Sequence, residues 1–220
     1  DRRVLTEEAC DRIGGVAGAL ARHADATLEQ IGAERLPIVR ELFRNLVTAE
    51  GTRAVREVDE LLSVFPENQR EPADEVLREL IDARLLTGYR EQEDEERPMR
   101  RVEIVHESLL SSWPRLVRWQ TQDTDGARLR DELRQAARLW DDHERARDYL
   151  WTGNAFREFA VWQANYPGGL TDLEEAFAAA MTSLATRRRR RRRMAAAAVF
   201  GVLLAVLVVV GALWQRSVRE

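Results

Sequence analysis

The apolar residues of this chain recur mostly three and four positions apart, which is the spacing of amphipathic α-helices. Leu129, Leu133, Ala136 and Trp140 show the pattern, because they repeat at intervals of four, three and four. Charged residues fill the positions between them, so each such helix should bury one face. The predicted helices cover Glu7–Ala24, Leu36–Ala49, Glu60–Val64, Glu71–Leu85, Asp125–Asp148, Leu150–Tyr166 and a last helix from Asp172, where Thr171 and Glu174 form a capping box.

Three short stretches alternate apolar and polar residues instead, as half-buried strands do. They are Gly51–Val58, Leu86–Glu91 and Met99–His106, and the last two flank an acidic loop at Gln92–Arg97. The order helix, strand, helix, helix, strand, loop, strand predicts a winged helix, which is a three-helix core with a small β-hairpin. From Glu107 onward the chain is predicted to be helical, with a break at Pro114.

The stretch Met194–Trp214 differs from the amphipathic helices, because it carries no charged residue on any face. A helix of this length, rising about 1.5 Å per residue, covers the roughly 30 Å hydrocarbon core of a bilayer. The polybasic run Arg187–Arg193 precedes it directly, and positive charge is retained on the cytoplasmic side. We therefore expect a single-pass protein of the cell membrane with residues 1–193 cytoplasmic and the tail 215–220 extracytoplasmic. The alternative is a buried core helix.

The net charge of the chain indicates which classes of partner it can bind. Removing the seven arginines of Arg187–Arg193 from the net charge of −4 leaves −11, so the rest of the chain is acidic. A nucleic-acid partner needs a basic face, and the predicted third helix and the hairpin of the winged helix are both acidic. We expect no nucleic-acid partner, whereas the arginine run is suited to anionic membrane lipids.

Motifs of catalysis are missing from the sequence. The chain has no lysine, so it cannot contain the phosphate loop G-x-x-x-x-G-K-[ST]. Cys10 is the single cysteine, which excludes an intrachain disulfide, and His23, His106 and His143 are scattered. We expect that this chain is not an enzyme. It begins with Asp1 rather than methionine, and we expect a fragment of a longer protein.

Two motifs carry a resemblance to a known family. The end of the third predicted strand and the residues after it, Val102–Leu110 and Ser112–Leu116, read VEIVHESLL and SWPRL. The glycine-containing stretch Ile13–Leu20 reads IGGVAGAL. Together they resemble the C-terminal part of bacterial STAND signalling NTPases, in particular the novel STAND group that often carries WD40 repeats downstream.

The resemblance implies a nucleotide-binding role for three residues. His106 occupies the position of the family's Met-His-Asp-type histidine, which reaches the nucleotide phosphates in the resting, ADP-bound state, and Gly14 and Gly15 would line the nucleotide through their backbone. The chain itself would hold no cofactor, while ATP or ADP with magnesium is implied for the full-length protein. The alternatives are a hydrogen-bonded surface histidine at position 106 and plain helix packing at the glycines.

We therefore expect a mainly α fold, in which a winged-helix domain with a small β-hairpin is followed by an α-helical connector and a single transmembrane helix. The expected function is the regulatory part of a membrane-anchored STAND ATPase switch, with the winged helix closing on nucleotide held by an upstream ATPase core. The predicted boundaries are 1–34 for the end of the STAND helical domain, 35–112 for the winged helix, 113–186 for the connector, 187–193 for the polybasic run and 194–214 for the transmembrane helix.

Two other functions fit the same elements. One is a membrane-tethered transcription regulator that uses the winged helix to bind DNA. The other is a passive membrane-anchored interaction scaffold without a nucleotide role. A phosphate loop encoded upstream of this chain would favour the switch over both.

Overall fold

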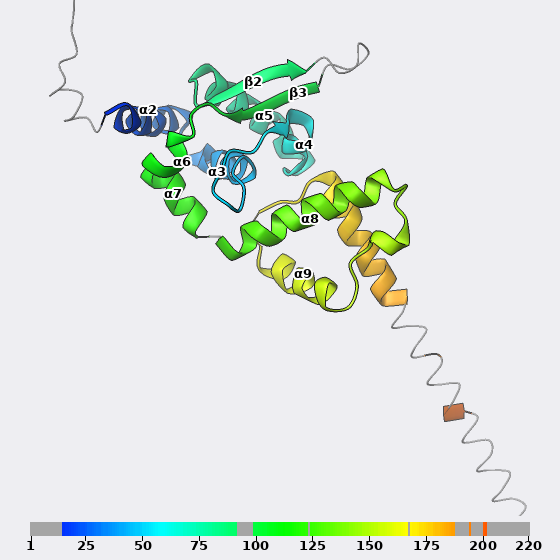
Figure 1. Ribbon diagram of the computed structural model, residues 1–220. Helices are drawn as coiled ribbons and strands as arrows, with labels where there is room; N and C mark the ends of the chain where they lie inside the picture. The colour runs from blue at the N-terminus through cyan, green and yellow to red at the C-terminus, as the bar shows by residue number, and fades with distance from the viewer. Residues whose placement is uncertain are drawn as a thin grey trace, which may run out of the picture.

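The computed structural model describes residues 15–91, 99–122, 124–166, 168–187, 194, 200 and 201 (Figure 1). Within these residues the chain is mainly helical, with one small three-stranded sheet. The elements are α2 (Gly15–Ile31), the 3-10 turn η1 (Ala33–Arg35), α3 (Leu36–Asn45), β1 (Arg56–Glu57), α4 (Val58–Ser63), α5 (Glu67–Asp82), β2 (Leu86–Glu91), β3 (Met99–Ile104), α6 (Ser108–Ser112), α7 (Pro114–Thr121), α8 (Thr124–Asp142), η2 (Arg147–Tyr149), α9 (Asn154–Asn165) and a last helix at 172–187.

The sheet has the strand order β1-β3-β2, and both pairings are antiparallel. Leu86 pairs with Ile104, and Val102 pairs with both Gly88 and Arg56. The side chains of Val102 and Ile104 are fully buried, as the alternation of the sequence predicts. Among the described residues, the order α3, β1, α4, α5, β2, β3 is the predicted one. The acidic loop at 92–98 lies outside the described residues.

The first strand is much shorter than the predicted Gly51–Val58. The Thr48 carbonyl accepts from Gly51, and the Thr48 backbone N–H donates to the Thr52 carbonyl at 2.9 Å, so this part of the chain forms a turn. Ala54 then donates to the carbonyl of Leu46 and is held against the end of α3. Only two residues remain to pair with β3, because the local turn takes the backbone groups that a longer strand would need.

The first hydrophobic core lies between α2, α3, α4, α5, the sheet, α6 and α7. Trp113, at the junction of α6 and α7, is fully buried in it and contacts the ring of Phe43 edge-on, with 5.3 Å between ring centroids. Its indole N–H donates to a carboxylate oxygen of Asp25 at 3.0 Å, which satisfies the polar atom of a buried aromatic ring. One residue thereby ties α2 and α3 to the start of the second half of the chain.

The second core lies between α8, α9 and the helix at 172–187. Leu133, Ala137 and Trp140 of α8 are buried in it, and the Trp140 ring contacts Phe177 at 5.5 Å. The capping box predicted at the start of the last helix is confirmed. Thr171 receives a hydrogen bond from the Glu174 backbone N–H at 3.2 Å, and its own N–H donates to the Glu174 carboxylate at 2.8 Å.

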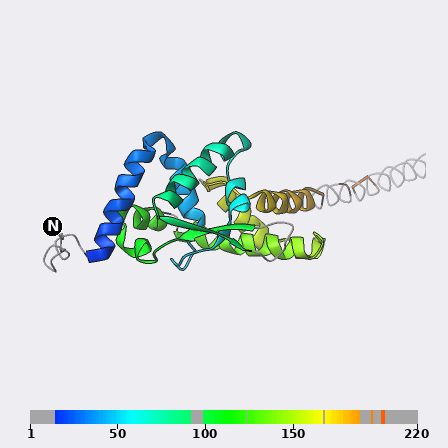
Figure 2. The same cartoon turned by 90° about the horizontal axis from the view of Figure 1, so that it is seen from above.

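Both views place α2 and the helix at 172–187 at opposite ends of the molecule, with α8 lying along the side of the first core (Figure 1). Figure 2 shows α2 and the 172–187 helix far apart as well, with the sheet and α5 between them. A change in packing at one end can therefore reach the other through the contacts of α8 and through the segment at 168–172, which contacts α4 and α5.

The predicted membrane-spanning helix requires a correction, and with it the fold class and the location that included it. Among the residues that the structure describes, none of the helices combines the length and the apolar character needed to cross a membrane. The described helices longer than one turn are amphipathic, because they bury apolar side chains in one of the two cores and expose polar or charged ones. The segment 194–214 lies outside the described residues except for Met194, Phe200 and Gly201, and so does the arginine run after Arg187.

Candidate functional site

His106 lies two residues beyond the end of β3 and directly precedes the turn into α6. Its backbone carbonyl accepts from the N–H of Leu109 at 3.0 Å, so the main chain of this residue starts α6. Its side chain is exposed, as are those of Glu107 and Ser108. The imidazole therefore projects from a strand end at the surface, where a neighbouring domain or ligand has access to it.

Gly15 is the first residue of α2, and Gly14 lies outside the described residues. The backbone of Gly15 has a φ of +66°, and a Cβ built there would meet no atom within 4 Å. This glycine is therefore needed for its left-handed backbone and not for close packing. Two residues on, the carbonyl of Ala17 accepts from the hydroxyl of Ser112 in α6 at 3.4 Å. The helix that starts at Gly15 thus packs against the helix that follows His106.

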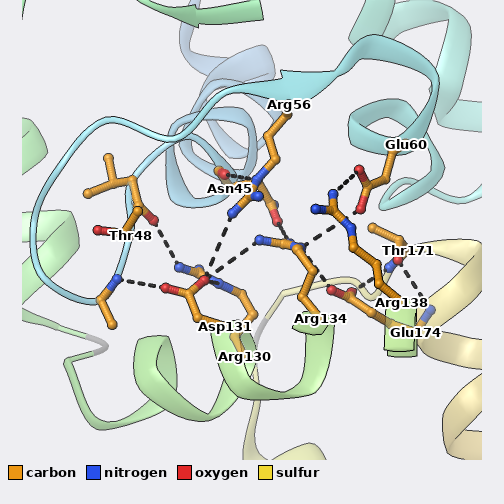
Figure 3. Close-up of polar contacts among 12 residues, drawn as sticks. Asn45, Thr48, Arg56, Glu60, Arg130, Asp131, Arg134, Arg138, Thr171 and Glu174 are labelled. Carbon is orange, nitrogen blue, oxygen red and sulfur yellow. Dashed lines mark hydrogen bonds and ion pairs between the residues drawn. The ribbon is translucent and has the colours of Figure 1, made fainter. Parts of the chain in front are cut away.

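A second polar site lies where α8 contacts both cores, and the sequence pattern did not reveal it. Arg134 is 5% exposed, and its Nη2 donates to Oδ1 of Asn45 in α3 at 2.8 Å. Its Nε lies 3.0 Å from Oε1 of Glu174, which is 1% exposed. Figure 3 shows this guanidinium between α3 on one side and the start of the 172–187 helix on the other.

Glu174 has two roles in this arrangement. One carboxylate oxygen accepts from the Thr171 backbone and caps the last helix, while the other faces Arg134. A carboxylate near a helix N-terminus is also favoured by the helix dipole. The residue that starts the last helix is therefore the same residue that compensates the buried charge of α8.

The preceding turn of α8 holds the loop after α3. The Nη2 of Arg130, which is 2% exposed, donates to the carbonyl of Val47 at 3.2 Å. Asp131 accepts from the backbone N–H of Ala49 at 2.8 Å, and its other oxygen lies 3.7 Å from Nη1 of Arg134 (Figure 3). Together these bonds satisfy backbone groups of the 47–49 turn that no strand or helix pairs.

Contacts at the rim extend the same interface. Arg138 of α8 pairs with Glu60 of α4 at 2.7 Å. Arg70 of α5 pairs with Asp172 at 2.6 Å, and the Asp172 N–H donates to the hydroxyl of Ser63 at 3.1 Å. These pairs are more exposed than Arg134 and Glu174 and add less stability each. The network thus has a dry centre at Arg134 and Glu174 and a solvated edge.

The electrostatics of the centre show how crowded the charges are. Burial, followed by the repulsion of Arg134, lowers the pKa of Arg56 from its usual value to about 10, while Glu60 and Asp131 oppose the shift. Arg56 still remains charged at neutral pH. Its Nε donates to the carbonyl of Asn45 at 3.0 Å, so the same asparagine bonds Arg56 through its backbone and Arg134 through its side chain.

Glu41, on α3, offers a pH test of this interface. Burial raises the pKa of its carboxyl above 4.5, although Arg44, Arg130, the Gly169 backbone and Asn45 oppose the shift. A raised pKa in the folded state means that Glu41 contributes stability below pH 4.5 that is lost as the pH rises through the folded-state value. We expect the free energy of unfolding of the native chain, relative to Glu41→Gln, to fall between about pH 4.5 and about pH 7.

Urea denaturation of both proteins at the two pH values measures this difference. Glu132→Gln, at an exposed position of α8, is the matched control and should follow the native chain at both. A relative stability that rises instead with pH would mean that the arginines outweigh burial at Glu41.

The arginines of this network are not apparent from the sequence pattern. Arg130 and Arg134 lie beside the apolar stripe of α8, and arginine is normally assigned to the solvated face. The stripe 129, 133, 136, 140 was predicted, whereas the structure buries Arg130, Leu133, Arg134, Ala137 and Trp140. The sequence does contain one indication. Arg130 and Arg134 are four residues apart beside the buried stripe, and two buried arginines require buried acceptors from other segments. The described residues contain no cluster of three or more metal-ligating side chains.

Comparison with known proteins identifies one relationship. A family model described as Novel STAND NTPase 1 matches residues 1–148 of this chain. No curated protein and no solved structure matches the chain.

Proposed function

This chain belongs to the Novel STAND NTPase 1 family, and from this premise we propose that it is the regulatory part of a STAND NTPase signalling switch. In this proposal α3, α4, α5 and the sheet act as a winged helix that closes on a nucleotide held by an upstream NTPase core. The core would supply the phosphate loop that this sequence lacks and would hold ATP or ADP with magnesium. WD40 repeats downstream of this chain remain a prediction from the resemblance.

The observation that carries the proposal is the position of His106. Its side chain is exposed at the end of a buried strand, and the helix after it packs against α2, which begins at Gly15. An imidazole donates a hydrogen bond to a phosphate oxygen in its neutral or charged form. A glycine with positive φ at the start of a helix leaves the helix N-terminus open to a nearby anion. Both features therefore favour a phosphate-facing surface.

A protein partner suits the exposed face of the proposed winged helix better than nucleic acid does. The exposed face of α5, the third helix of the proposed winged helix, carries Glu67, Glu71 and Glu75. These carboxylates would repel the phosphates of DNA, where α5 would have to enter the major groove. We infer that the winged helix packs against protein.

The buried network on α8 would relay the state of the winged helix to the rest of the chain. Arg134 bonds α3 on one side and the start of the 172–187 helix on the other. A shift of α3 relative to α8 would break the buried hydrogen bond from Arg134 to Asn45, so the interface favours discrete arrangements over gradual ones. Nucleotide exchange would select between them by differential contacts.

Replacing His106 with alanine in the full-length protein tests the nucleotide role. We expect ADP to dissociate about 10- to 100-fold faster, because one hydrogen bond to a charged phosphate contributes about 1.5–3 kcal/mol. Release of a fluorescent ADP analogue on stopped-flow mixing measures the rate, and basal signalling should rise with it.

His143→Ala is the matched control, because His143 is exposed, donates from its ring to the Leu139 carbonyl of α8 at 2.8 Å and stacks on Tyr149 of η2. Its ADP release should equal that of the native protein. Equal ADP release from the native protein and His106→Ala would remove the phosphate role from His106.

A further inference from the structure

A cavity of about 260 Å³ lies beside the first core, and neither His106 nor Gly15 lines it. Its walls come from α3, the turn at 47–51, α7 and α8. The first core and α8 therefore both contribute to it, and it adjoins the network around Arg134 through Arg130. A cavity of about 150 Å³ holds a benzene ring, so this volume has room for one ring with a short acidic substituent.

One wall of the cavity is aromatic and aliphatic. It contains Phe43, Leu116 and Trp119. Trp119 is only partly buried, and its ring lies 5.7 Å from that of Trp113 and 6.5 Å from that of Phe43. A planar apolar group can pack on such a wall without displacing polar partners.

The polar part of the lining is rich in guanidinium groups. Arg40, Arg44 and Arg130 all line the cavity, with the exposed Glu50 as its carboxylate. The Nε atoms of Arg40 and Arg130 are buried and have no hydrogen-bond partner among the described residues. The Nη2 of Arg40 donates to Gln122 at 2.8 Å, and the Nε of Arg130 lies 4.0 Å from a carboxylate oxygen of Asp131. Buried donors without partners are uncommon and costly in native proteins, and an anion is the acceptor that guanidinium prefers.

We propose that this cavity binds a small ring-bearing organic anion, a carboxylate or a phosphate monoester. Its ring would pack on Trp119 and Phe43, and its acidic group would accept from Arg40 and Arg130. Since the cavity walls belong to the first core and to α8, the ligand would favour the packed arrangement of the two. The site would act as a second input to the switch, and its ligand binding does not depend on the nucleotide role of His106.

The test is a titration of the full chain with simple probes, in which ligand-detected NMR measures binding. Benzoate and phenyl phosphate supply the two acidic groups on the same ring, benzyl alcohol is the neutral analogue, and acetate lacks the ring. We expect saturable binding of benzoate or phenyl phosphate with a Kd at or below about 1 mM and at least about tenfold weaker binding of benzyl alcohol and acetate. The better of the two anions identifies the acidic group.

Two variants locate the binding. Arg40→Gln should weaken the preferred anion about tenfold, since it removes one charge-assisted donor. Arg118→Gln, the same change at an exposed position of α7 that does not line the cavity, should leave the affinity unchanged. Ala127→Phe, which fills the cavity from α8, should abolish binding while circular dichroism shows an intact fold.

The proposal fails if neither anion binds saturably at about 1 mM, or if benzyl alcohol binds as well as benzoate. It also fails if Arg118→Gln weakens binding as much as Arg40→Gln does, since the anion would then be attracted by charge alone. None of these outcomes alters the expected ADP release of His106→Ala, so the two proposals are tested separately.

Discussion

Replacing Arg134 with methionine is expected to lower the free energy of unfolding by about 3–5 kcal/mol, because it leaves a buried carboxylate without its partner. Glu174 is 1% exposed and faces Arg134 at 3.0 Å, and no solvent is available to replace the guanidinium. Methionine matches the aliphatic stem of arginine, so the loss of packing is small. The side-chain oxygen of Asn45 loses its donor as well.

Chemical denaturation followed by circular dichroism measures the effect, and two further variants separate its causes. Arg128→Met removes an arginine of the same helix whose side chain is 81% exposed and pairs with Glu132, and it should change the free energy of unfolding by less than about 0.5 kcal/mol. In the double variant Arg134→Met with Glu174→Gln, both charges are gone, so much of the stability should return. Equal losses for Arg128→Met and Arg134→Met would show that Arg134 is solvated in solution.

Replacing Gly169 with alanine is expected to be the second most damaging change. A Cβ at this position would lie 2.0 Å from the carbonyl oxygen of Val64, which is backbone and cannot rotate away. The segment before the last helix must then withdraw from the end of α4. That movement also strains the bond from the Asp172 N–H to Ser63 and the pair between Asp172 and Arg70. We expect a loss of about 3 kcal/mol from overpacking and the broken contacts.

Gly153→Ala supplies the comparison for a glycine that is needed only for its backbone. Its backbone has φ +64° and ψ −120°, a region that only glycine adopts readily, and a Cβ there would meet no atom within 4 Å. The expected loss of about 1–3 kcal/mol therefore comes from backbone strain alone. Hydrogen exchange adds a local readout, since protection should fall at the start of the 172–187 helix in Gly169→Ala and stay unchanged there in Gly153→Ala. If protection at the start of the 172–187 helix falls equally in the two alanine variants, the close approach of Gly169 to Val64 is not a constraint.

The two effects bear on the proposed switch, because both residues hold the last helix against the first core. In the full-length protein Gly169→Ala should uncouple signalling from nucleotide while ADP release stays native. His106→Ala should change ADP release itself. The pair of results would separate the nucleotide contact from the relay.

The candidate site was partly predictable from local pattern. His106 follows two alternating apolar residues, Val102 and Ile104, and this places it at the end of a buried strand, where the structure has it. The helix at Gly15 was predicted to begin earlier, at Glu7, and residues 1–14 lie outside the described part of the chain. The packing of α2 against α6 joins residues about ninety positions apart, and no periodicity in the sequence reports it.

The sequence by itself determined the elements whose cause is local. β2 has the predicted bounds Leu86–Glu91, since its turn residues and alternation act within a few residues. The capping box of Thr171 and Glu174 follows from the same short-range chemistry. The predicted membrane span rested on the length and apolar character of 194–214 and on the arginines before it, and the described helices gave no support to it.

Only the tertiary structure decided which polar side chains are buried and what compensates them. Arg134 is compensated by Asn45 and Glu174, which lie 89 and 40 positions away in the chain. An arginine can be buried only if acceptors from other segments lie beside it once the two cores have packed. The free energy of that pairing depends on the geometry of the contact and not on the local sequence. Helical periodicity identifies the face of α8, while the opposing surfaces determine whether arginine can occupy it.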